Sequence, residues 1–314
     1  MISETNKIQA KKAFYIKLGL HGEYESECLA SPGFAKIGWT ELPSSMLQGD
    51  PDQIDWEAIR ILLNNHYKSK GTATNQTNQL KNFITSSPDT LWITFYSNHL
   101  YWCFLDSTFD IHEDKTKTRR TLDGWHHTNI HGEPLQFNRL SGSLLTLKGF
   151  RGTICTVREL DYLLRKINGE SSPEEARVEK AYLELTQSLQ EIIHRLHWKE
   201  FELLTDLNFR QAGWQRVSEL GKTQKSIDLE LFSPITNESI LVQVKSKAGI
   251  TEFEMFEQFA LSSQASQCYF VVHKPSQSLI NKSSTSQVTT WSVEEIARLV
   301  VNYGLVEWLI AKAK

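Results

Sequence analysis

The sequence lacks several features that would place it in a class of proteins. Its 314 residues include only four cysteines, Cys28, Cys103, Cys155 and Cys268, and they form no Cys-x-x-Cys pair. This spacing favours neither a disulfide framework nor a zinc site. No apolar run approaches the roughly eighteen residues of a membrane helix, and the start of the chain has no apolar core long enough for a signal peptide. We therefore expect a cytoplasmic protein without a membrane partner.

A large excess of one charge is also missing. The formal net charge is −3, with 40% hydrophobic and 23% charged residues, which is typical of a folded globular chain long enough for two domains. This balance neither indicates nor excludes nucleic-acid binding, because affinity depends on a local basic surface. The densest basic run contains Lys115, Lys117, Arg119 and Arg120. It is either a solvated loop or a contact to a nucleic-acid backbone.

Two predicted strands carry polar side chains where apolar ones are usual. Residues 227–231 (Ile-Asp-Leu-Glu-Leu) alternate strictly, and residues 240–245 (Ile-Leu-Val-Gln-Val-Lys) form a second strand. Residues 233–239 between them have the composition of a turn. A period of two places Gln243 and Lys245 on one face, so the hairpin brings Asp228 opposite an amide and an ammonium. Asp228 either forms a structural salt bridge with Lys245 or belongs to a metal site.

The strongest linker signal is residues 168–173 (Asn-Gly-Glu-Ser-Ser-Pro), which also start a helix with a capping box. That helix should extend to about residue 194, with an apolar stripe from Val178 to Ile193. A second helix covers residues 198–210 and ends at Gly213. A strand at residues 214–220 and a loop at 221–225 follow, and Ser292 and Glu295 form a second capping box that opens the last helix. The second half then reads α-β-β-β-α-β-β-α, which predicts an α/β domain with a mixed central sheet flanked by helices. The predicted domains are residues 1–168 and 169–314.

Residues 196–275 resemble the PD-(D/E)xK nucleases, and specifically the Mrr-like branch of restriction endonucleases. The residues that match are Phe201-Glu202 on the helix, Gly213-Trp214 after it, Ile227-Asp228 on one strand and Gln243-Val244-Lys245 on the next. Two positions depart from the general pattern. The glycine that commonly stands beside the acid is replaced by Ser226-Ile227, and the motif's glutamate is Gln243, the form that Mrr-like enzymes usually show.

The resemblance implies a magnesium- or manganese-dependent endodeoxyribonuclease that acts on double-stranded DNA. Its catalytic residues would be Glu202, Asp228, Gln243 and Lys245. Asp228, the Gln243 amide and the Val244 carbonyl would bind the metal, since Mg²⁺ prefers oxygen ligands.

Further candidate residues and a partner follow from the nuclease half. Glu200 is an alternative to Glu202 as the helix acid. Lys247 continues the face of Lys245 and is a candidate contact to the nucleic-acid backbone. Cutting both strands needs two active sites, so we expect a homodimer.

The first half is predicted to be a strand-rich α+β domain with many aromatic residues. Strands are expected near residues 13–18, 34–39, 91–96, 100–105, 144–147 and 153–155, and helices at 55–63 and 75–84. Asp55 is the expected N-cap of the first helix, and residues 97–99 are expected to join two of the strands in a tight hairpin. The tryptophans are either core residues or the walls of a pocket that stacks a flat ligand. Residues 12–160 resemble the PUA-like superfamily, including EVE and YTH-type base readers, in their aromatic opening strand, the Gly-Trp after the second strand, and the later aromatic strand pair. The resemblance implies base-binding walls at Trp39 and at Trp92 or Trp102.

Together the two halves predict a modification-dependent, type IV-like restriction endonuclease that serves in defence against foreign DNA, including DNA with modified cytosine. One alternative keeps the nuclease but has the first domain sense a nucleotide or RNA. The other is a non-catalytic nucleic-acid-binding protein on a nuclease fold, against which the intact Asp228, Gln243 and Lys245 argue.

Overall fold

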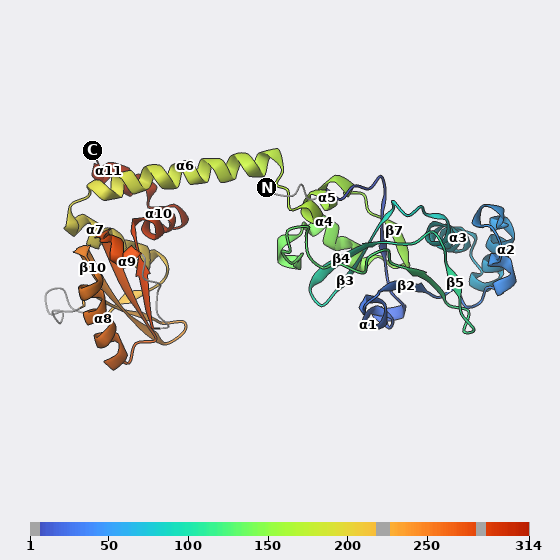
Figure 1. Ribbon diagram of the computed structural model, residues 1–314, viewed down its shortest axis with the longest axis horizontal. Coiled ribbons are helices and arrows are strands. Elements are labelled where there is room, and N and C mark those ends of the chain that lie inside the picture. The colour runs from blue at the N-terminus through green and yellow to red at the C-terminus, as the bar shows by residue number, and fades with distance from the viewer. Residues whose placement is uncertain (1–6, 218–226, 281–286, 314) are drawn as a thin grey trace. The chain divides into compact units, whose positions relative to one another are not determined.

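The computed structural model describes residues 7–217, 227–280 and 287–313. The predicted loop 221–225 and Ser226 lie outside these ranges. The chain divides into two compact units, Met1–Pro173 and Glu174–Lys314, drawn in blue to green and in yellow to red in Figure 1. Each unit has its own hydrophobic core.

The N-terminal unit contains two sheets. The larger has the order β4 (His99–Phe104), β3 (Leu91–Tyr96), β1 (Ala13–Ile16) and β7 (Ile154–Thr156), and only its β1–β3 pair is parallel. The smaller has the order β2 (Phe34–Ile37), β6 (Lys117–Arg120) and β5 (Asp110–Ile111), all antiparallel. The predicted β3–β4 hairpin is present, and its turn residues Ser97 and Asn98 both have positive φ, as a type I′ turn requires.

Five α-helices belong to this unit among the described residues: α1 (Glu25–Leu29), α2 (Trp56–Tyr67), α3 (Lys70–Thr85), α4 (Gly142–Leu145) and α5 (Leu160–Asn168). The Asp55 side chain accepts a hydrogen bond from the Ala58 N–H and caps α2 as predicted. The strand predicted at 144–147 is wrong. Those residues form α4 and the following 3-10 turn η5 (Thr146–Gly149), because the Ser141 hydroxyl accepts from the Leu144 N–H and starts a helix.

The C-terminal unit is built on a five-stranded mixed sheet, as the sequence predicts. Its order is β12 (Val288–Trp291), β11 (Gln267–Pro275), β10 (Glu238–Ala248), β9 (Leu229–Ser233) and β8 (Gln215–Arg216). The β8–β9 and β9–β10 pairs are antiparallel, whereas β10–β11 and β11–β12 are parallel. The helices are α6 (Pro173–Arg195), α7 (Trp198–Gln211), α8 (Ile250–Ser262), α9 (Gln277–Ile280), α10 (Val293–Asn302) and α11 (Val306–Ala313).

The two faces of this sheet belong to different cores. Leu229 and Val242 pack in a core with residues of α7 and α10. Leu241 packs on the other face, in a core with Phe253 and Phe256 of α8. Because side chains alternate along β10, Gln243 and Lys245 follow Leu241 on the α8 face.

Helix α6 buries less than its sequence pattern predicts. The stripe is buried in the second half, at Leu189 and Ile193, but Val178 in the first half is 69% exposed. No helix among the described residues is long and apolar enough to cross a bilayer.

Candidate active site

The carboxylate of Asp228 lies at the place where β9 begins. The main-chain N–H of Val244 donates to Oδ2 of Asp228 at 2.7 Å, and the N–H of Asp228 donates to the Val242 carbonyl at 3.1 Å. The last residue pair between the two strands is Leu229 with Val242. Asp228 therefore stands just before β9. The alternation of residues 227–231 predicted a position inside the strand, which is wrong by one residue. The side chain of Asp228 takes the role of a strand partner for Val244.

Gln243 and Lys245 stand on either side of Val244. Gln243 is only 6% exposed, and no hydrogen bond joins its amide to another residue in the described ranges. Lys245 is half-buried. Its charge lies within electrostatic reach of Asp228 and of Glu252, whose pKa is lowered mainly by the Gly249 N–H and also by Lys245. The structure thus brings an acid, an amide and an ammonium together along the middle of β10.

The two acids of the site resist ionisation. Burial raises the pKa of Asp228, although the Val244 N–H and the charges of Lys245 and Arg216 act in the opposite direction. Burial also raises the pKa of Glu202 on α7, and the nearby Asp228 raises it further. A bound cation would reduce the repulsion between these two half-buried carboxylates and favour their charged forms.

The two candidate helix acids have different surroundings. Glu200 forms the capping box of α7, since its Oε2 accepts from the His197 N–H at 3.1 Å. Glu202 lies one half-turn further on, within electrostatic reach of Asp228. The geometry therefore favours Glu202 as the acid of the site.

Arg216 on β8 is a site residue that the sequence reading did not single out. Its Nη2 donates to the main-chain carbonyl of Asp228 at 3.1 Å, and its charge lowers the pKa of both Asp228 and Glu202. A strand was predicted at residues 214–220. An arginine on the strand that precedes the one with the acid is the sequence signal that could have identified Arg216.

The donors at this position suit a divalent metal. A residue in a strand directs its N–H and C=O to the same side, so the Val244 carbonyl points to the side of Asp228. One oxygen of Asp228 accepts from Val244, which leaves the other for a cation. With the Gln243 amide oxygen this gives three hard oxygen ligands of the kind that Mg²⁺ prefers. The described ranges contain no group of three or more His, Cys, Asp and Glu side chains that would form a metal site.

The three tryptophans predicted as base-binding walls lie in the core of the N-terminal unit. Trp92 is fully buried, with ring centroids of Phe14 and Phe83 at 5.2 and 5.8 Å. Trp39 and Trp102 are 6% and 5% exposed. The Trp102 indole N–H donates to the Thr128 carbonyl at 2.9 Å. Their ring faces are occupied by protein, so this arrangement does not fit a cage open to a ligand.

Half of the basic run is also buried. Lys117 donates to the carbonyls of Gly38 and Trp39 at 3.1 and 2.6 Å, and burial lowers the pKa of Lys117 to about 8. Arg119 donates to main-chain carbonyls that include that of Phe83, at 2.6 Å. These two side chains point inward from β6 and cannot reach a phosphate. Lys115 and Arg120 are exposed, as is Lys247 on β10, and they remain candidate backbone contacts.

Comparison with known proteins bears on the C-terminal unit. Residues 193–300 match the protein-family model Mrr_cat, described as a restriction endonuclease. Residues 193–300 thus carry a restriction endonuclease domain. This domain holds Glu202, Asp228, Gln243 and Lys245, and the predicted Mrr-like resemblance of the second half is confirmed.

Comparisons with solved structures and with curated proteins give weaker information about this chain. The chain is similar to a solved structure titled "DNA modification-dependent restriction endonuclease AspBHI", with 13% sequence identity, a TM-score of 0.32, and coverage of 89% of this chain and 79% of that one. A TM-score this low does not show a common fold. No curated protein matches the sequence. The PUA-like character of the N-terminal unit stays a prediction.

Proposed function

We propose that the protein is a modification-dependent DNA restriction endonuclease. The restriction endonuclease domain would hydrolyse phosphodiester bonds with Mg²⁺ or Mn²⁺, and the N-terminal unit would read a modified base, such as a modified cytosine. The observation that carries the proposal is the hydrogen bond of 2.7 Å that holds the Asp228 carboxylate beside Gln243, Val244 and Lys245. The match of residues 193–300 to restriction endonucleases supports it.

The chemistry follows from what each group can donate or accept. Asp228, the Gln243 amide oxygen and the Val244 carbonyl would hold the metal ion. When bound, such an ion supplies positive charge at the scissile phosphate and lowers the pKa of a water. Lys245 donates hydrogen bonds to a phosphate oxygen or orients the attacking water. Glu202 accepts a proton from that water or orients it from the side of α7. Arg216 holds the main chain of Asp228 in place.

The test compares cleavage of matched duplexes that carry unmodified, methylated or hydroxymethylated cytosine, with Mg²⁺ and with a chelator. We expect cleavage only with the metal and only next to a modified base. Lys245→Ala should lower the cleavage rate by about 100-fold or more, because it removes a donor that acts on the developing charge, while DNA binding is retained. Lys247→Ala is the matched control, since it removes an exposed lysine from the same strand face and should reduce affinity without abolishing cleavage.

Each alternative has its own outcome in this assay. Cleavage that ignores modification would remove base reading and favour an N-terminal unit that senses a nucleotide or RNA. Binding without cleavage of any substrate, unchanged in Lys245→Ala, would indicate a non-catalytic binding protein. Equal cleavage by Lys245→Ala and the wild type would contradict the assignment of the active site.

A further inference from the structure

Among the hollows of the N-terminal unit, one of about 660 Å³ and one of about 630 Å³ have volumes within the range of about 300–1,000 Å³ that is usual for small-ligand sites. The hollow of about 660 Å³ over the β2–β6–β5 sheet is lined mainly by groups that already pair with each other. His112 Nε2 bonds the Thr118 hydroxyl at 2.8 Å, and the Thr116 hydroxyl donates to Asp114 at 2.6 Å. Few polar groups remain there to recognise a ligand.

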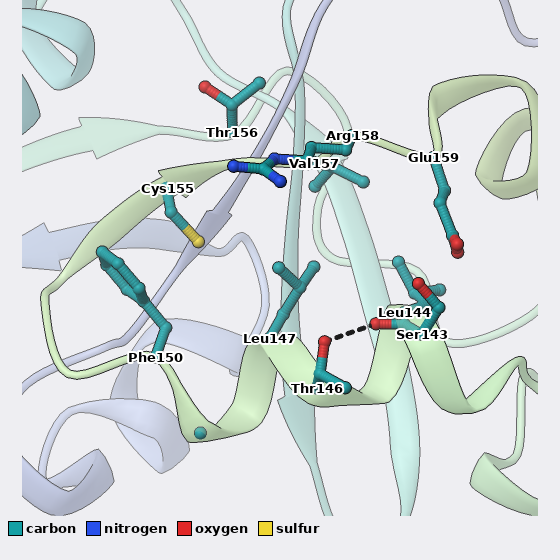
Figure 2. Close-up of a pocket in the computed structure, with 11 residues that line it drawn as sticks. Ser143, Leu144, Thr146, Leu147, Phe150, Cys155, Thr156, Val157, Arg158 and Glu159 are labelled. Carbon is teal, nitrogen blue, oxygen red and sulfur yellow. Dashed lines mark hydrogen bonds between the residues drawn. The ribbon is translucent and has the colours of Figure 1, made fainter.

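The second hollow, of about 630 Å³, lies between β7 and the segment formed by α4 and η5. Figure 2 shows its walls: Leu144 and Leu147 on the helical side, and Cys155 and Val157 on the strand side. The ring of Phe150 stands at one end, and the side chain of Arg158 extends along the rim above Cys155. The lining therefore combines these apolar side chains with polar ones, because Ser143, Thr146 and Glu159 also face the hollow.

The main chain of Thr156 offers a donor and an acceptor at the edge of the sheet, next to this hollow. The N–H of Val157 donates to the Ala13 carbonyl at 2.9 Å, and the Thr153 carbonyl accepts from the Lys17 N–H at 2.8 Å. Since successive residues of an antiparallel strand direct their main-chain groups to opposite sides, residues 153, 155 and 157 face β1 and Thr156 faces away. Strand β7 is the edge of its sheet. The N–H and C=O of Thr156 thus lie on the side of β7 that no strand covers, and Thr156 is one of the residues that line the hollow.

We propose that this hollow binds a nucleobase extruded from the DNA duplex, an inference that rests on the proposed function. A flat ring with an acceptor next to a donor on its edge, as cytosine has, complements the paired N–H and C=O of Thr156. Phe150 and the Arg158 guanidinium can stack on such a ring, and Arg158 can also pair with a flanking phosphate. Burial raises the pKa of the Cys155 thiol to about 11, so this group is neutral and packs against the ring rather than attacking it.

The test measures binding of the full chain carrying Lys245→Ala, a change that we expect to slow cleavage by about 100-fold or more. Duplexes with modified or unmodified cytosine carry 2-aminopurine beside the target, whose fluorescence rises when the neighbouring base leaves the stack. We expect Arg158→Ala and Phe150→Leu to lower the ratio of modified to unmodified affinity by about 10-fold and to abolish the fluorescence rise. Arg158 is exposed, so its replacement should not unfold the unit. Arg120→Ala, at the other hollow, is the control and should leave the ratio unchanged.

The outcomes separate the two proposals. If the parent protein discriminates and both variants discriminate equally well, the hollow beside β7 is not the base site, and the proposed function stands. Loss of discrimination in Arg120→Ala alone also overturns the inference, because it places the base over the β2–β6–β5 sheet. If the parent binds all duplexes alike, base reading itself fails and the inference fails with it.

Discussion

The carboxylate of Asp228 occupies a position that suits a metal better than it suits the stability of the folded protein. It is half-buried, close to the second acid Glu202, and its pKa is raised by burial. The Val244 N–H and the charges of Lys245 and Arg216 offset only part of this effect. Strain of this kind is common where activity requires a group that folding alone would not favour.

Asp228→Asn should therefore stabilise the metal-free protein at neutral pH. A folded-state pKa above the unfolded value, about 3.9 for aspartate, means that stability is highest below the unfolded value and falls as the pH rises through the folded one. The amide oxygen of the substituted side chain can still accept from the Val244 N–H. Thermal unfolding in a chelator should show a higher Tm for the variant at pH 7 and equal values below about pH 4.

Metal addition provides the control for this experiment. Mg²⁺ should raise the Tm of the wild type and have little effect on the variant, because binding to the folded state alone stabilises it. A lower Tm for Asp228→Asn at pH 7 would contradict the argument and show that the bond to Val244 needs a charged acceptor.

Single residues also show where sequence reasoning ends. Gln243 and Lys245 could be placed on one face because strand periodicity is local. Lys117 could not be placed in the core, since the carbonyls that surround it belong to Gly38 and Trp39, far away in the sequence. For the same reason Trp92 suggested a binding wall, although Phe14 and Phe83 cover its ring.

At the scale of elements, α7 places two glutamates in different roles within one turn. Glu200→Ala should lower the free energy of unfolding by about 0.5–2 kcal/mol, the usual range for a helix cap, while cleavage is kept. Glu202→Ala should lower cleavage by about 10-fold or more with little loss of stability, because burial and Asp228 already disfavour its charge. Unfolding and cleavage are to be measured on the same preparations.

The reverse result would reassign the helix acid. Loss of cleavage in Glu200→Ala with an unchanged Tm would show that Glu200 leaves the capping box when DNA binds. The capping distance of 3.1 Å from the His197 N–H to Glu200 Oε2 argues against that outcome.

Helices and strands were predictable where packing agrees with local pattern. The capping box of Ser292 and Glu295 starts α10 as the sequence predicts, and β10 extends the predicted strand at both ends. The prediction for residues 144–147 was wrong because closely spaced leucines fit both the strand period and the helix period. The Ser141 hydroxyl accepts from the Leu144 N–H and starts a helix. The stripe on α6 was overestimated, since a periodic pattern cannot show that Val178 stays exposed in the folded unit.

At the scale of the whole molecule, each chain holds one set of Asp228, Gln243 and Lys245. Under the proposed function, one such set hydrolyses one phosphodiester bond, and a double-strand break needs two bonds cut. Two chains acting together provide both sites at once, which is the basis of the expected homodimer.

Mixing active and inactive chains tests this expectation on a supercoiled plasmid with modified sites. With the wild type alone and protein limiting, the rate at which linear product forms should rise with about the square of the protein concentration. Association of two chains requires this dependence. Mixed with excess Lys245→Ala, whose DNA binding is retained, each active chain should sit opposite an inactive one and leave nicked circles. Linear product that depends linearly on concentration and is unaffected by the inactive chain would show instead that one chain cuts both strands in succession.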